Sequence, residues 1–239
     1  MFERPHHQRI ARVLLSLNGP LLRELGCLFG GGTAIVLRRG EYRESLDIDF
    51  LVSNPAGYRQ LRQRLTGRQG LAAILDPGAS GIETVRDIRA DQYGIRTMLL
   101  VGGQQIKFEI ILEGRIPLEP PGPDDEVCGI STLSFLDLAV SKLLANSDRW
   151  HDDGVFSRDL IDLAMLCPST RLLKKAVAKA ETAYGDAIVR DLDKAIRSLQ
   201  ERPGRFDRCL KALDIELPKA LLWDRIRRLR RALPQPKGQ

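Results

Sequence analysis

Apolar residues recur at helical spacing in the first 25 residues of the chain. They are Ile10, Val13, Leu14, Leu17, Leu21, Leu22 and Leu25. Intervals of three and four residues place apolar side chains on one face of a helix. The run is broken at residues 18–20, where Asn, Gly and Pro follow one another. Because Gly and Pro interrupt helices, the pattern predicts two short helices rather than one long helix.

A different pattern follows, in which two predicted strands enclose a glycine turn and a short helix. Residues 27–29 are apolar and short enough for a strand; glycines occupy positions 30–32, and Thr33 opens the apolar segment AIVL. After a charged, turn-like link, residues 46–52 are rich in apolar and β-branched side chains. A glycine turn that leads into a helix leaves backbone N–H groups unpaired at the positive end of the helix dipole. Such a turn is a suitable place for a phosphate group.

Two carboxylates interrupt the second of these strands, at Asp47 and Asp49. Side chains two residues apart on a strand point to the same face, so the two carboxylates are predicted to lie side by side. Their repulsion costs stability unless a cation lies between them. The pattern therefore indicates a divalent metal site beside a phosphate-binding turn. The alternative is a solvated strand face without chemistry.

Strand periodicity returns between residues 82 and 112. Residues 84–89 are predicted to pair with residues 94–101, which meet residues 105–112 across the turn signal Gly102-Gly103. Lys107 and Glu109 share one face of the last strand. Glu109 is therefore either an edge residue that faces solvent or a third carboxylate of the metal site.

Prolines at positions 117, 120, 121 and 123 mark the expected domain boundary. We expect an α+β protein: residues 1–115 form a core with a short mixed β-sheet and packed helices, and residues 116–130 form a link. A helical domain over residues 131–233 completes the active site, and a disordered tail covers residues 234–239. A helix begins after residue 54, where Asn-Pro precedes an amphipathic stretch.

The first helix of the expected helical domain is capped by Ser131 or Thr132 and extends to Ser147. It is apolar almost all round yet carries Lys142. A second helix opens at Ser157, and Asp159 and Asp162 lie on one side of it. Three or four amphipathic helices follow up to residue 233. Lys142 and the two acids either serve the site or form an interhelix ion pair, and acids in a first helical turn also suit the helix dipole.

The last predicted helix has an apolar stripe at Leu222, Ile226, Leu229 and Leu233. Five arginines crowd the rest of its circumference: Arg225, Arg227, Arg228, Arg230 and Arg231. Like charges at these spacings repel, which favours a bound anion such as RNA. The alternatives are a solvated helix end or cations that suit the dipole at a helix C-terminus. The net charge of +6 makes an acidic partner reasonable without identifying one.

The four cysteines are scattered, without metal-ligand spacing or a disulfide framework. No apolar run approaches the length of a membrane span, and the N-terminus has no uninterrupted apolar region of the signal-peptide type. The expected location is therefore the cytoplasm, without membrane association.

Taken in order, the motifs resemble those of DNA-polymerase-β-like nucleotidyltransferases. The motifs are Gly31-Gly32-Thr33, Ser45-Leu46-Asp47-Ile48-Asp49-Phe50 and Ile106-Lys107-Phe108-Glu109. Lys142 and the segment Arg158-Asp159-Leu160-Ile161-Asp162-Leu163 are similar to the AbiEii/AbiGii toxin family within that superfamily. The resemblance spans residues 27–166.

This resemblance implies an enzyme that moves a nucleoside monophosphate from a nucleoside triphosphate, such as ATP or CTP, to an acceptor hydroxyl. Asp47 and Asp49 would bind Mg²⁺ or Mn²⁺, and Glu109 would be the third ligand or the base. Gly31, Gly32 and Thr33 would hold the β- and γ-phosphates, and Lys142 would neutralise triphosphate charge.

Asp159, or Asp162 in its place, would orient Lys142 or contact the nucleotide. The expected acceptor is an RNA end, with tRNA as the first choice, bound by Arg225, Arg227, Arg228 and Arg231. The protein would act as a toxin with a cognate antitoxin. The alternatives are transfer to a small molecule or protein side chain, and a non-catalytic RNA- or protein-binding relative.

Overall fold

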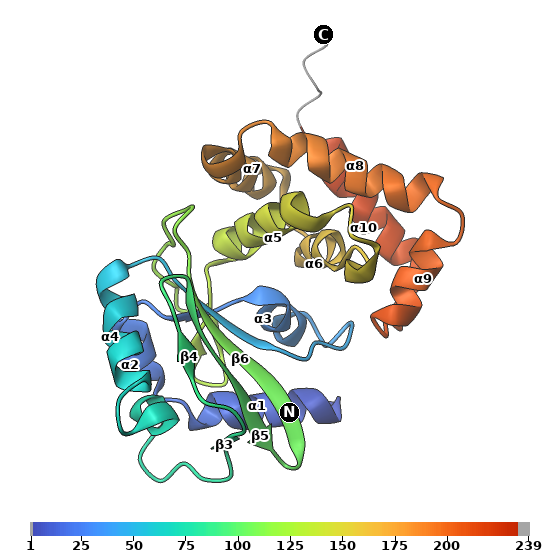
Figure 1. Ribbon diagram of the computed structural model, residues 1–239. Coiled ribbons are helices and arrows are strands. Elements are labelled where there is room, and N and C mark those ends of the chain that lie inside the picture. The colour runs from blue at the N-terminus through green and yellow to red at the C-terminus, as the bar shows by residue number, and fades with distance from the viewer. Residues whose placement is uncertain (1, 234–239) are drawn as a thin grey trace. The chain divides into compact units, whose positions relative to one another are not determined.

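The computed structural model describes residues 2–233, which form two compact units (Figure 1). The first unit contains the described residues up to Glu41 together with Ser45–Ser134. The second contains Tyr42–Glu44 and the described residues from Phe135 onward. A mixed sheet with helices forms the first unit and helices form the second, so the predicted α+β class is confirmed. Residues 116–134 belong to the first unit.

The helices of the first unit gather around its sheet in Figure 1. They are α1 (Pro5–Ser16), α2 (Gly19–Glu24), α3 (Gly31–Arg38) and α4 (Pro55–Leu65), with a 3₁₀ helix η1 (Gly70–Ile74). The predicted break between the first two helices is confirmed, because Asn18 caps α2 by accepting a hydrogen bond from the backbone N–H of Leu21 at 2.9 Å. Pro20 then lies in the first turn of α2, where no N–H is needed.

The sheet has the strand order β1-β2-β6-β5-β3, and β4 also pairs with β5. The strands are β1 (Leu28–Phe29), β2 (Ile48–Val52), β3 (Glu83–Thr84), β4 (Arg89–Ala90), β5 (Gly94–Val101) and β6 (Gln104–Leu112). β2 and β6 are parallel and the other pairs are antiparallel, so the expected mixed sheet is confirmed. Gly102 and Gly103 join β5 to β6 with positive φ angles, as a two-residue hairpin turn requires.

One face of the sheet is apolar and buried. Phe50 lies 5.6 Å from both Phe29 and Phe108, measured between ring centroids, and all three side chains are buried. Side chains alternate along a strand, so Asp49 and Glu109 belong to the opposite face. The aromatic core therefore sets which face carries the predicted site.

Three predicted boundaries of this unit are wrong. The strand expected over residues 46–52 begins at Ile48, so Asp47 precedes it. The helix expected from Thr33 begins at Gly31. The strand expected over residues 84–89 is replaced by the short strands β3 and β4. Charged, exposed side chains dominate this stretch, so little apolar burial is available to hold one continuous strand there.

The Pro-rich link contains a small hairpin formed by β7 (Glu126–Val127) and β8 (Ile130–Ser131). The predicted helix cap at Ser131 or Thr132 is therefore wrong. Ser131 lies in β8, and the Thr132 hydroxyl accepts a hydrogen bond from Arg38 Nη1 at 2.8 Å. The following helix begins at Phe135, shortly after Leu133, whose backbone N–H donates to the Phe29 carbonyl oxygen at 2.9 Å.

The second unit is helical. Its helices are α5 (Phe135–Arg149), α6 (Arg158–Leu166), α7 (Thr170–Tyr184), α8 (Ala187–Glu201), α9 (Arg205–Ala212) and α10 (Lys219–Ala232), with a 3₁₀ helix η2 (Asp153–Val155). The prediction of several helices after α6 is confirmed, and Leu222, Ile226 and Leu229 of α10 are buried as expected. Leu233 is only partly buried. The tail over residues 234–239 lies outside the described residues.

Candidate functional site

The glycine turn at the start of α3 lies against the strand that carries Asp49. The backbone N–H of Gly30 donates to the Asp49 carbonyl oxygen at 2.8 Å. Gly31 has a φ of +65°, and a Cβ at this position would lie 2.5 Å from Oδ2 of Asp49. A side chain at residue 31 would therefore collide with the carboxylate. The first turn of α3 and the Asp49 carboxylate share one small volume.

Thr33 connects α3 to the segment before β2. Its buried hydroxyl lies 2.8 Å from the Ser45 hydroxyl and donates to the Asp47 carbonyl oxygen at 2.5 Å. These contacts tie α3 to the residue predicted as the first metal ligand. The Thr33 hydroxyl thus has two partners within the first unit, and the phosphate contact predicted for it stays a prediction.

Glu109 lies beside Asp49 because the parallel register of β2 and β6 pairs these two residues. On its other side it pairs with Arg96 of β5. Its carboxylate is 3.2 Å from Arg96 Nε and 2.7 Å from Lys107 Nζ. Two cations thus neutralise Glu109, which is the acid expected to be a metal ligand or a base.

The carboxylates of Asp47, Asp49 and Glu109 determine how well a divalent cation fits the site. Within residues 2–233, no group of three or more His, Cys, Asp or Glu side chains is placed to hold a metal ion. Mg²⁺ takes oxygen ligands and retains several waters, so one or two carboxylates beside a phosphate are sufficient for it. Asp47 and Asp49 supply ligands of this type. Each carboxylate oxygen of Glu109 already has one cationic partner, Arg96 or Lys107.

The remaining predicted acids and Lys142 form a buried ion network within the second unit. Lys142 Nζ lies 3.0 Å from Oδ1 of Asp159 and 2.7 Å from Oδ2 of Asp162. Arg149 Nε is 2.7 Å from Oδ2 of Asp159. All of these side chains except Arg149 are at most 5% exposed. This geometry matches the interhelix ion pair that the sequence left open as an alternative for Lys142.

Tyr42 and Arg43 complete the network, and sequence reasoning did not identify them. The Tyr42 hydroxyl donates to Oδ1 of Asp162 at 2.7 Å. Arg43 binds the same carboxylate through Nε at 2.8 Å and Nη2 at 2.9 Å. Tyr42–Glu44 connect Glu41 to Ser45 without belonging to the first unit. Their only signal in the sequence was a charged link, which has no periodicity.

The pKa values of both acids follow from this network. Burial by itself would raise the pKa of Asp159, but the charge of Lys142 and the hydrogen bonds from Arg149 outweigh burial and lower the pKa. For Asp162, burial is likewise opposed by the charges of Arg43 and Lys142, and the pKa is again lowered. Both groups are therefore carboxylates at neutral pH.

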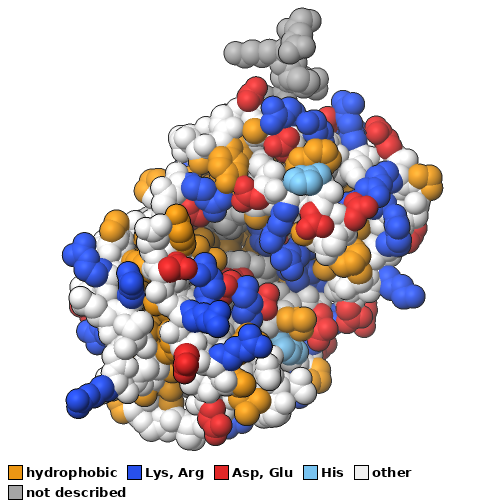
Figure 2. Space-filling view, in the orientation of Figure 1, with side chains coloured by type: hydrophobic (Ala, Val, Ile, Leu, Met, Phe, Trp, Pro, Cys, Tyr) orange, Lys and Arg blue, Asp and Glu red, His pale blue; other side chains and the backbone are white. Residues whose placement is uncertain are grey.

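The arginines that the sequence predicts to bind RNA all lie on α10. Asp224 lies 2.8 Å from Arg228, 3.6 Å from Arg231 and 3.8 Å from Arg227. Arg225 donates instead to the sulfur of Met165 at 2.8 Å. On the face that Figure 2 shows, acidic and basic side chains are intermixed.

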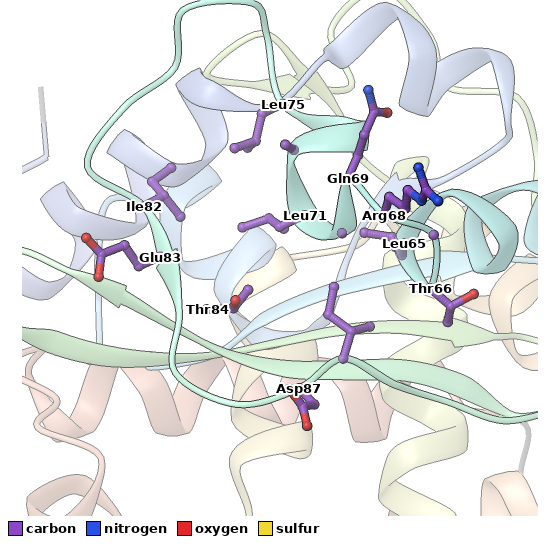
Figure 3. Close-up of a pocket in the computed structure, with 14 residues that line it drawn as sticks. Leu65, Thr66, Arg68, Gln69, Leu71, Leu75, Ile82, Glu83, Thr84 and Asp87 are labelled. Atoms are coloured by element: carbon purple, nitrogen blue, oxygen red, sulfur yellow. The ribbon is translucent and has the colours of Figure 1, made fainter.

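A cavity of about 600 Å³ in the first unit lies apart from all of these residues. It is bounded by the end of α4, by η1 and by residues 82–88, and Leu65, Leu71 and Leu75 line it with apolar surface (Figure 3). No predicted site residue contributes to its lining. Within the helices of residues 2–233, none is long and apolar enough to cross a membrane.

Comparisons with known proteins agree with the motifs. The sequence model of a family described as "Nucleotidyl transferase AbiEii toxin, Type IV TA system" matches residues 19–235. No curated protein has a significant sequence match to the chain.

Two solved structures from Helicobacter pylori have a similar fold. One is a protein assigned provisionally as a nucleotidyltransferase, with a TM-score of 0.53 and 17% identity over 94% of this chain and 93% of that one. The other is the protein JHP933, with a TM-score of 0.55 and 16% identity over 97% of this chain and 94% of that one. At such identities these two likenesses concern the fold alone.

Proposed function

Because the chain belongs to the AbiEii family of nucleotidyltransferase toxins of type IV toxin–antitoxin systems, we propose that it transfers a nucleoside monophosphate to an RNA end. The donor is a nucleoside triphosphate, pyrophosphate is released, and the expected acceptor hydroxyl belongs to tRNA. Family membership also implies a cognate antitoxin. The observation that carries the proposal is the approach of the Asp49 carboxylate to the glycine turn of α3.

In this proposal the glycine turn binds the triphosphate. The first N–H groups of α3 have no helical partner and lie at the positive end of its dipole, so they suit phosphate oxygens. Gly31 leaves the space that a side chain would fill, and Gly32 continues the turn. Thr33 fixes the distance between this turn and Asp47 through its hydrogen bond.

Asp47 and Asp49 would hold a divalent cation next to the bound phosphates. When bound, Mg²⁺ or Mn²⁺ supplies charge stabilisation to phosphoryl displacement. Glu109 is the proposed base for the acceptor hydroxyl, a role that requires its release from Lys107 and Arg96.

Lys142, Asp159 and Asp162 have a more limited role in the proposal. Two carboxylates engage Lys142, and its proposed role is to supply positive charge for the triphosphate. Asp159 orients the lysine and Asp162 holds Tyr42 and Arg43, which are followed closely in the chain by Asp47.

The metal part of the proposal is tested by calorimetric titration of ATP and CTP with and without Mg²⁺. Asp49→Asn removes one charge and should abolish metal-dependent nucleotide binding. Asp76→Asn makes the same chemical change at an exposed acid of the first unit and should bind like the parent. Equal nucleotide affinity in excess chelator would remove the metal from the proposal.

The acceptor is tested by tRNA binding and radiolabel transfer at several salt concentrations. Each phosphate contact changes the slope of log affinity against log salt by roughly 0.7 for single strands and 0.9 for duplex. Replacing Arg227, Arg228 and Arg231 with Gln should flatten this slope and leave nucleotide affinity unchanged. Replacing the exposed Arg59, Arg62 and Arg64 of α4 with Gln removes the same charge and is the control. If neither parent nor variants bind RNA, a small-molecule or protein acceptor replaces RNA.

A further inference from the structure

A cavity of about 380 Å³ lies within the second unit, between the end of α6, the start of α7 and α10. Arg225, Arg228 and Arg231 line it, together with the hydroxyl residues Ser169 and Thr170. Within the described part of the chain, no acidic side chain contributes to the lining. A concave site of this size is typical for a small ligand group, and its three guanidinium groups select an anion.

The charges around this cavity are not balanced by the acids near it. Asp224 is the carboxylate paired with Arg227, Arg228 and Arg231, so three positive charges share one negative charge. Like charges so closely spaced along a helix repel. An anion in the cavity would relieve this repulsion.

Arg225 points to the same conclusion independently. This partly buried guanidinium donates to the thioether sulfur of Met165, which is a weak acceptor. A partly buried cation is stabilised far better by an anionic oxygen than by such a sulfur. Arg225 therefore has capacity for a stronger acceptor within the cavity that it lines.

The start of α7 adds further donors. Ser169 caps this 15-residue helix by accepting a hydrogen bond from the N–H of Leu172 at 3.2 Å. The N–H groups of Thr170 and Arg171 belong to the same first turn, whose donors have no helical acceptor. The positive end of the helix dipole thus meets the three arginines at one cavity.

We propose that this cavity binds a phosphate group of the RNA acceptor, held by Arg225, Arg228 and Arg231 and the first turn of α7. The RNA part rests on the proposed function, whereas the anion site rests on the cavity itself. Planar guanidinium groups bind phosphate oxygens in pairs, which fixes both position and orientation. The phosphate is either an internal phosphodiester or a 5′-terminal phosphate.

Cys167 provides a local probe, since it lines the cavity and is exposed, while Cys27 and Cys209 are buried. Alkylation by iodoacetamide is followed at each cysteine by mass spectrometry. Inorganic phosphate at ten times its dissociation constant should slow alkylation of Cys167 by about tenfold. Cys128, in the first unit, should react at an unchanged rate.

Substitutions in α10 test whether its arginines are responsible for the protection of Cys167 by phosphate. Arg225→Gln should weaken the protection by phosphate at least about tenfold, as loss of a charged hydrogen bond predicts. Arg228→Gln should act in the same direction, and its exposed side chain makes misfolding no concern. Arg230→Gln is the control, because it removes one charge from the same helix but does not line the cavity and pairs with Asp193 instead. Equal protection in Arg225→Gln, Arg228→Gln and Arg230→Gln would overturn the site.

RNA oligonucleotides with and without a 5′-phosphate show whether the bound group is an internal phosphodiester or the 5′-terminal phosphate. Protection by both indicates a phosphodiester, and protection by the 5′-phosphorylated form alone indicates the terminal group. If inorganic phosphate protects Cys167 but no RNA does, the RNA assignment is wrong and only an anion site remains. The protection measurement needs no turnover. Protection of Cys167 can therefore be absent while nucleotidyl transfer to RNA succeeds, and it can be present while transfer to RNA fails.

Discussion

At the residue scale, Lys142 is the centre of a buried ion network. The sequence placed it on an apolar helix, where it could serve catalysis or an ion pair. Its ammonium group lies between two buried carboxylates in the structure. Charges removed from water are costly unless every partner is present, so a buried network is sensitive to the loss of one member.

We therefore predict that Lys142→Met lowers the free energy of unfolding by about 3 kcal/mol, the low end of the range for a broken buried pair. The low end is expected because Arg43 and Arg149 still compensate the two acids. Denaturant unfolding followed by tryptophan fluorescence measures the change, since Trp150 and Trp223 both belong to the second unit.

The control is Lys194→Met. Lys194 is 48% exposed and lies 3.9 Å from Asp191, and such surface pairs contribute less than about 1 kcal/mol. Similar losses in the two variants would show that the network does not stabilise the unit. Transfer activity of the folded Lys142→Met protein separates a nucleotide contact from a purely structural role.

At the element scale, the glycine turn lies directly against β2. Gly31 combines a left-handed backbone with the approach of Asp49 Oδ2. Either feature alone disfavours a side chain at residue 31. The N-cap of α3 is Gly30, which has no side chain that could cap the helix.

We predict that Gly31→Ala abolishes nucleotide binding and destabilises the protein more than Gly26→Ala does. Gly26 has a φ of +66°, and a Cβ at this position would have no heavy atom within 4 Å, so its replacement incurs the backbone cost alone. That cost is about 1–2 kcal/mol for a left-handed alanine. Calorimetric nucleotide titration and thermal melting of both variants measure the difference. Normal nucleotide binding by Gly31→Ala would show that the turn does not approach the phosphates.

At the scale of the whole molecule, each unit contains its own acid-sensitive group. Burial lowers the pKa of His7 despite the opposing effect of Glu41. His7 Nε2 accepts a hydrogen bond from the Ser45 N–H at 3.1 Å, so the ring proton is on Nδ1, which lies 2.7 Å from Glu41. The folded first unit thus holds a neutral imidazole, and the second unit holds two ionised acids.

The lowered pKa values of His7, Asp159 and Asp162 all predict a loss of stability on acidification. A histidine with a lowered folded-state pKa stabilises the folded state above its unfolded pKa of about 6.5, and this contribution is lost as the pH falls. Asp159 and Asp162 likewise contribute above about pH 4, and their contribution is lost below it. The protection factors of first-unit amides, which are corrected for the pH dependence of intrinsic exchange, should therefore fall between about pH 6.5 and 5. The unfolding transition of the second unit, followed by tryptophan fluorescence, should stay constant over this range.

His7→Gln keeps a polar group but cannot take up a proton in this range. This substitution should remove the change in amide protection of the first unit between about pH 6.5 and 5. It should not alter the loss of second-unit stability below about pH 4. If the parent protein shows no change in amide protection above about pH 5, His7 does not control the acid stability of the first unit.

The amino-acid sequence by itself determined the local elements and the family. Apolar spacing indicated the helices, the alternation in residues 94–112 indicated a hairpin, and the order of short motifs indicated the nucleotidyltransferase family. These features depend on neighbours within a few residues, where periodicity and turn chemistry act directly. Boundaries failed where other segments competed, as at Ser131, which pairs in a hairpin instead of capping a helix.

Only the tertiary structure decided which charges meet. Glu109 lies beside Asp49 but is neutralised by Arg96 and Lys107, and Asp162 is bound by Tyr42 and Arg43, more than one hundred residues earlier in the chain. The arginines of α10 line a cavity only because α6 and α7 form its other walls. Long-range partners of this kind are set by packing and strand register, which no local pattern of residues encodes.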